Sequence, residues 1–79
     1  MTCRDEILRC VRTLLHQTGR QEFTLQEVVD AMQAAGTGYA ESTIRTHVAS
    51  RMCANAPEHH AVTYGDFVRV GDGVYRLAA

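Results

Sequence analysis

The chain has 79 residues, a hydrophobic content of 46% and a net charge of −1. This length allows one small domain that buries roughly 60% of its unfolded surface, so we expect residues 1–79 to form a single domain without a deep catalytic pocket. The hydrophobic content excludes intrinsic disorder, and the near-neutral charge gives no support to nucleic-acid binding, for which basic domains are typical.

The chain shows no sign of secretion or membrane insertion. Its start, MTCRDEILRC, carries charges where a signal peptide needs an apolar stretch, and the longest apolar run is three residues. The three cysteines form no CxxC pair, which is typical of free thiols in a reducing compartment. We therefore expect a cytoplasmic protein without membrane contact.

The first predicted element is a helix over residues 3–18, whose apolar residues recur on one face with a period of 3.6. Thr2 and Asp5 have the spacing of a capping box at its start, and Gly19 is placed to end it. A short extended stretch follows near residues 22–24. We expect the core of the domain to comprise Ile7, Val11, Leu14, Leu25, Val28, Val29, Met32, Ile44, Val48, Tyr75 and Leu77.

Two further helices are predicted over residues 25–35 and 40–53. Thr24 and Glu27 form a second capping box before the first of them. The sequence GTGYA between the two helices contains two glycines, which is typical of a tight turn. Asn55 is expected to cap the end of the third helix, shortly before Pro57.

The last segment, DFVRVGDGVYRLA, changes to a period of two and predicts a hairpin within residues 61–78. Its turn is the dipeptide Asp72-Gly73. The expected register places apolar pairs on the core face, namely Val70 with Tyr75 and Val68 with Leu77. Arg69 and Arg76 then face each other on the other side, close to Phe67 unless a bulge turns that ring inward.

Three helices, a glycine-containing turn and a C-terminal hairpin predict an α+β, mainly α fold: a winged helix-turn-helix. The stretch near residues 22–24 would complete a small three-stranded sheet. In this architecture the third helix usually enters the major groove of DNA.

The third predicted helix, in ESTIRTHVASRM, has apolar residues on one side and small polar residues on the other. The candidate DNA-contacting residues are Ser42, Thr43, Arg45, Thr46 and Ser50. A merely solvated face usually carries Lys and Glu, which favour helices more than Ser and Thr do. Short hydroxyls beside one arginine fit a backbone that approaches a groove closely. A plain solvated face and a protein contact are the alternatives.

The hairpin and the loop before it supply further candidates. Arg69 and Arg76, if opposed, repel each other slightly, and a DNA phosphate between them would reverse that penalty. His59 and His60 in the loop NAPEHH are candidates for contacts to backbone or phosphate, and their protonation near about pH 6 would add positive charge. The alternative is that both arginines extend into water.

Neither catalysis nor metal binding is expected. Cys53, His59 and His60 have metal-ligating side chains, but there is no paired C-x₂₋₄-C, and adjacent histidines rarely bind one ion together. Nothing in the sequence supplies a catalytic triad, an oxyanion hole or a substrate cleft. We therefore expect a binding module that is not an enzyme and holds no cofactor.

The segment from YAESTIRTH to GVYRLA resembles the small winged-helix domains of bacterial restriction systems, which are often fused to nuclease domains. It is distantly similar to the winged helices called HARE-HTH and to the N-terminal domain of Mrr-type enzymes. The motifs ESTIRTH, NAPEHHAV and GVYRL carry the resemblance, which spans residues 22–78. The resemblance implies binding of double-stranded DNA, with modified DNA as a candidate ligand, and a nuclease domain fused to or associated with this module. It implies no catalysis in the module itself.

The main alternative is a winged helix that binds another protein and makes no direct DNA contact, which the low net charge favours. The amino-acid sequence indicates neither the oligomeric state nor which DNA sequence is bound.

Overall fold

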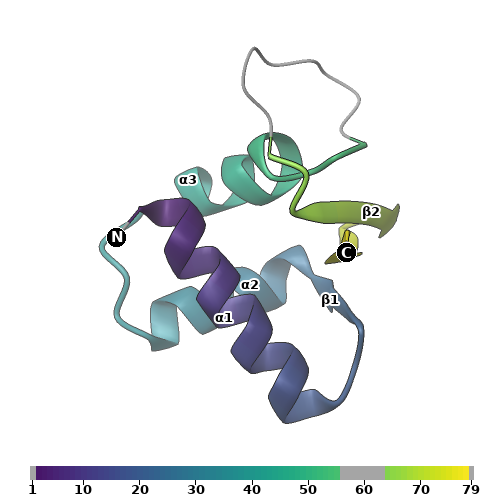
Figure 1. Cartoon of the computed structure of the whole chain (residues 1–79). Helices are drawn as coiled ribbons and strands as arrows, with labels where there is room; N and C mark the ends of the chain where they lie inside the picture. Colours follow the sequence, from purple (N-terminus) through teal and green to yellow (C-terminus); the bar gives the residue numbers. More distant parts are fainter. Residues whose placement is uncertain (1, 56–63, 79) are drawn as a thin grey trace.

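The computed structural model, which describes residues 2–55 and 64–78, has three helical segments packed against a small antiparallel sheet (Figure 1). The elements in chain order are α1 (Cys3–Thr18), β1 (Glu22–Thr24), α2 (Leu25–Ala34), α3 (Glu41–Thr46), the π-helical η1 (His47–Arg51), β2 (Phe67–Gly71) and β3 (Val74–Leu77). The strand order β1-β3-β2 places the last strand in the middle. This is the predicted small α+β fold of the winged-helix type. Within the described part of the chain, no helix combines the length and apolar character needed to cross a membrane.

The helix ends follow the predicted local chemistry. Thr2 Oγ1 accepts from the Asp5 amide and the Asp5 carboxylate accepts from the Thr2 amide, each at 3.2 Å. Thr24 and Glu27 make the same reciprocal pair before α2. Gly19 ends α1 with φ 69°, a left-handed conformation that other residues rarely adopt. Both capping boxes are therefore confirmed, and α2 ends one residue earlier than expected.

The third helix is shorter and less regular than the predicted span of residues 40–53. Regular α-helix ends at Thr46, and η1 continues with a wider turn in which the Met52 amide donates to the His47 carbonyl at 2.8 Å. Such π-helical turns are rare and often lie at functional sites. Ile44, Val48 and Met52 are nevertheless fully buried, so the predicted apolar stripe of this helix is confirmed.

The hairpin turns at Asp72-Gly73, but its register differs from the predicted one. Gly71 pairs with Val74 as expected, and a bulge then shifts the pairing. The observed pairs beyond the bulge are Arg69 with Tyr75, Val68 with Arg76, and Phe67 with Leu77. The predicted pairs Val70–Tyr75, Val68–Leu77 and Arg69–Arg76 are therefore wrong.

The bulge exchanges one apolar side chain for a larger one in the core. Val70 is left 44% exposed, while Phe67 is fully buried. A bulge inserts one unpaired residue and so moves the residues before it to the opposite face. Burying a phenyl ring removes more apolar area from water than burying a valine, which favours the bulged register.

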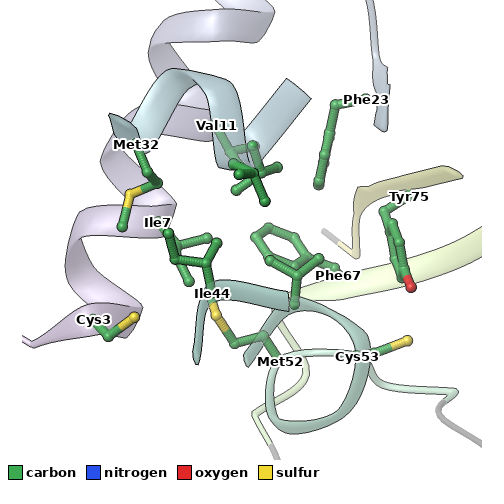
Figure 2. Packing of buried hydrophobic residues seen from close by; sticks show 13 residues of the cluster. Cys3, Ile7, Val11, Phe23, Met32, Ile44, Met52, Cys53, Phe67 and Tyr75 are labelled. Atoms are coloured by element: carbon green, nitrogen blue, oxygen red, sulfur yellow. The ribbon is translucent and has the colours of Figure 1, made fainter. Parts of the chain in front are cut away.

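An aromatic cluster forms the centre of the core beneath the sheet (Figure 2). Phe23 and Phe67 meet edge to face with ring centroids 5.1 Å apart, and Tyr75 stacks against Phe23 at 6.2 Å. The buried residues are Cys3, Ile7, Val11, Phe23, Val28, Val29, Met32, Ile44, Val48, Met52, Cys53, Phe67 and Tyr75. The predicted core residues Leu14, Leu25 and Leu77 pack against this cluster but stay partly exposed. Phe23 and Phe67, absent from the predicted core, are the largest of its fully buried side chains.

A polar clamp fastens α1 to the segment that enters β2. Arg4 Nε donates to Asp66 at 2.8 Å and Arg4 Nη2 donates to the other carboxylate oxygen at 2.9 Å. The same guanidinium lies 4.0 Å from the centroid of the Tyr64 ring. This bidentate ion pair gives Arg4 a structural role, so Arg4 is not a candidate for ligand contact.

The cap of α2 predicts a measurable pH dependence. Glu27 accepts hydrogen bonds from the Arg20 side chain and from the Thr24 amide, and these bonds, the first above all, hold the pKa of Glu27 below its usual range. A carboxylate whose pKa falls on folding stabilises the native state above its unfolded pKa, and this contribution is lost as the pH falls through the folded pKa. We therefore expect Glu27→Gln to destabilise the protein at neutral pH by an amount that shrinks in acid.

Urea denaturation of both proteins over a series of pH values measures this difference. Glu22→Gln is the matched control, because Glu22 forms no ion pair with any residue in the described ranges 2–55 and 64–78. If the difference in free energy of unfolding between the wild type and Glu27→Gln stayed constant down to acidic pH, the assignment of the effect to this carboxylate would be contradicted.

Candidate nucleic-acid interface

Three elements meet at the start of α2. The Leu25 amide donates to the Gly73 carbonyl at 3.0 Å, which holds the turn of the hairpin against the first turn of α2. One residue further, Gln26 accepts from Arg45 of α3 at 2.6 Å. The first turn of α2 therefore lies next to both α3 and the hairpin turn. We call this the α3–wing surface, made up of Gln26, Glu41, Ser42, Arg45, Thr46, Arg69 and Asp72.

Arg45 lies on this surface with its side chain 38% exposed, as its place on the polar side of the predicted helix indicates. It is not a free arginine, however. Its Nε donates to Glu41 at 2.8 Å and its Nη2 donates to Gln26 at 2.6 Å. Nη1 makes no hydrogen bond to any residue that the structure describes. Part of the guanidinium fork is therefore available to an external acceptor.

The hydroxyl residues of the third helix divide into two groups. Ser42 and Thr46 are exposed beside Arg45, whereas Thr43 and Ser50 are half-buried on the flanks. Thr46 Oγ1 donates to the Ser42 carbonyl at 2.9 Å. A hydroxyl oxygen that donates in this way still has lone pairs with which to accept a hydrogen bond. The outward group is the one positioned for contact with a ligand.

The two wing arginines lie in different places. Arg69 bends back onto the hairpin turn, where its Nε donates to the Gly71 carbonyl and its Nη2 to Asp72, each at 3.1 Å. Arg76 lies on the central strand between Glu22 and Val68.

Arg76 also lines a surface pocket of about 310 Å³ near the end of α1, together with Leu15, Arg20, Gln21 and Leu77. Arg69 and Arg76 therefore do not face each other, and the predicted phosphate clamp between them is wrong. The bulge is the cause, because it moves Arg69 to the opposite face of the hairpin. Arg69 belongs to the α3–wing surface, and Arg76 does not.

The candidate residues His59 and His60 lie outside the described residues. Within the described ranges, no three His, Cys, Asp or Glu side chains are grouped so that they could hold a metal ion.

Much of the positive charge is balanced by a neighbouring acid. The ion pairs among the described residues are Arg4–Asp66, Arg20–Glu27, Arg45–Glu41 and Arg69–Asp72. Two of these pairs lie on the α3–wing surface, which is therefore nearly neutral. Any ligand that binds through Arg45 or Arg69 must share these cations with their carboxylates or displace the carboxylates.

The segment after η1 pairs with β2 and fixes the hairpin. The Phe67 amide donates to the Met52 carbonyl at 2.8 Å, and the Ala54 amide donates to the Phe67 carbonyl at 2.7 Å. Asn55 extends this pairing with its side chain, accepting from the Arg69 amide at 2.9 Å and donating to the Arg69 carbonyl at 3.1 Å. Asn55 therefore ties the end of the third helix to the wing and does not cap that helix as predicted.

Asn55→Ala is expected to destabilise the protein by about 1–3 kcal/mol, because a net hydrogen bond contributes about 0.5–1.5 kcal/mol and both bonds to the Arg69 backbone are lost. Asn55→Asp keeps the acceptor and loses the donor, so its effect should be smaller near neutral pH. Urea denaturation gives the free energies, and hydrogen exchange at the Arg69 amide reports the contact itself. Unchanged exchange at this amide in Asn55→Ala would show that the side chain does not hold the strand.

Comparison with known proteins identifies a family. Residues 2–77 match the model of a family described as a domain of unknown function (DUF7669). The chain belongs to this family. The matched range includes α2, α3 and the whole hairpin, so the complete α3–wing surface lies inside the DUF7669 domain. No curated protein and no solved structure matches the chain. The resemblance to restriction-system winged helices stays a prediction.

Proposed function

We propose that this domain binds double-stranded DNA, with α3 in the major groove and the wing on the phosphate backbone. The observation that supports this most strongly is the α3–wing surface, because winged helix-turn-helix proteins contact DNA with these elements. Ser42 and Thr46 are short enough to let the backbone of α3 approach base edges. Arg45 offers unused donors between them.

The local ion pairs set the strength expected of this binding. An exposed ion pair contributes about 0–1 kcal/mol, so exchanging the Asp72 carboxylate for a phosphate oxygen on Arg69 costs little. The charge of Asp72 also disfavours deep insertion of the wing tip into a groove. We therefore propose that the wing contacts the backbone from outside and that the domain makes few phosphate contacts.

The resemblance to restriction-system winged helices supports a wider role for the domain. In this proposal it is a non-catalytic cytoplasmic module that brings DNA, with modified DNA as one candidate, to a nuclease domain fused to or associated with it.

A second candidate function is docking of a protein partner on the same surface. The pairing of Arg45 and Arg69 with carboxylates favours this alternative, since a nearly neutral surface attracts DNA weakly.

Salt dependence separates the two functions. We expect the affinity for a labelled duplex, measured by fluorescence anisotropy, to fall with rising salt with a shallow logarithmic slope of about −1 to −2, as one or two phosphate contacts give. Lack of binding even at low salt would leave the protein-docking function as the better account.

A further inference from the structure

A chain of four polar side chains crosses from α2 to α3 on the α3–wing surface. Gln26 Nε2 donates to Asp30 at 3.0 Å, Arg45 Nη2 donates to Gln26 Oε1 at 2.6 Å, and Arg45 Nε donates to Glu41 at 2.8 Å. Arg45 is therefore held from two helices at once. An arginine fixed in this way has already lost much of the rotamer freedom that binding would otherwise remove.

The donors that stay available on Arg45 define the shape of its ligand. Nη1 carries two N–H groups and has no partner among the described residues, and Nη2 carries one N–H beyond its bond to Gln26. Adjacent N–H groups of a guanidinium form a planar fork that matches two neighbouring acceptors. A carboxylate, a phosphate and the O6/N7 edge of guanine all offer such a pair.

The charges around Arg45 decide among these ligands. Glu41 already contacts the guanidinium, and Asp30 follows at the other end of the chain of hydrogen bonds. A phosphate or carboxylate at the free fork would bring another negative charge next to Glu41. Guanine offers two acceptors without a net charge, and adenine offers one acceptor beside a donor, which opposes the fork.

We propose that Arg45 reads the major-groove edge of a guanine and that Glu41 is a positioning residue that keeps Arg45 on the base and off the phosphates. This inference rests on the proposed DNA binding and names the base that the domain prefers. Glu41 acts through charge as well as contact, because its carboxylate repels the competing phosphate.

The test compares three short duplexes of one sequence containing alternating guanine and cytosine. One is unmodified, one has 7-deazaguanine in place of guanine and so lacks the N7 acceptor, and one has inosine, which keeps O6 and N7 but lacks the minor-groove amino group. We expect the wild-type protein to bind the 7-deazaguanine duplex about tenfold more weakly than the unmodified one, and the inosine duplex about equally.

Two variants at the α3–wing surface separate recognition of the guanine edge from electrostatic attraction to DNA. Arg45→Lys keeps the positive charge without the fork, so it should bind DNA but lose most of the tenfold preference. Glu41→Gln keeps the shape of the side chain and removes the charge that repels phosphate. It should reduce the preference for the unmodified over the 7-deazaguanine duplex without weakening overall DNA binding. Glu22→Gln changes the net charge equally on β1, away from this surface, and should leave the preference unchanged.

The outcomes distinguish this inference from the proposed function. Equal binding of the unmodified and 7-deazaguanine duplexes by the wild type would overturn guanine reading and leave DNA binding in place. A preference that Glu41→Gln leaves intact would overturn the positioning role of Glu41. Lack of binding to all three duplexes at low salt would overturn DNA binding and the inference together.

Discussion

Phe67→Ala is expected to lower the free energy of unfolding by about 3–5 kcal/mol, a large share of the stability of a domain of this size. The ring is fully buried and meets Phe23 edge to face at 5.1 Å (Figure 2). Its removal forfeits the transfer free energy of the phenyl group, opens a cavity under the sheet and breaks the aromatic contact.

Val70→Ala is the matched control, three residues along the same strand. Its side chain is 44% exposed in the bulge, so the substitution should change stability by no more than about 0.5 kcal/mol. Urea denaturation followed by circular dichroism measures both variants. If Val70→Ala cost more than Phe67→Ala, the bulged register would be wrong and the regular hairpin predicted from the sequence would be right.

Arg45→Ala and Arg69→Ala are expected to weaken DNA binding in different ways. Loss of Arg45 should cost about 1–3 kcal/mol on a preferred duplex and less on others, because a base contact is lost. Loss of Arg69 should weaken all sequences about equally and lower the salt slope by about one, because a phosphate contact is lost. Both variants should keep close to wild-type stability, since exposed ion pairs contribute little to folding.

Fluorescence anisotropy at several salt concentrations measures both effects. Arg12→Ala on α1 removes the same charge from an exposed residue outside the α3–wing surface, and it should bind DNA nearly as the wild type does. A double variant, Arg45→Ala/Arg69→Ala, that bound DNA as tightly as the parent at matched salt would contradict the role of this surface. The protein-docking function would then be preferred.

The sequence predicts the local features of the fold better than its register. The capping boxes of Thr2 and Thr24 each depend on residues within one helical turn, so spacing alone identifies them. The hairpin register depends on which side chain best fills the space beside Phe23. Packing between residues far apart in the sequence decides this. The alternation of apolar and polar residues and the turn type therefore could not predict the bulge at Val70.

The candidate site shows the same division. The apolar spacing of the third helix places Arg45 outward, and the four-residue spacing from Glu41 is a signal from which their ion pair could have been predicted. The contact between Arg45 and Gln26 depends on how α2 packs against α3, and the bond between Asn55 and the backbone of Arg69 depends on where the third helix ends. Neither follows from spacing along the chain.

The DNA-binding proposal is tested most directly by an NMR titration of the labelled protein with a short duplex at low salt. The proposal predicts that the largest amide shifts fall at Gln26, in residues 41–46 and in residues 69–73, while the middle of α1 is unaffected. Shifts that gathered on α1 instead, or a spectrum unchanged at excess duplex, would contradict DNA binding by the α3–wing surface.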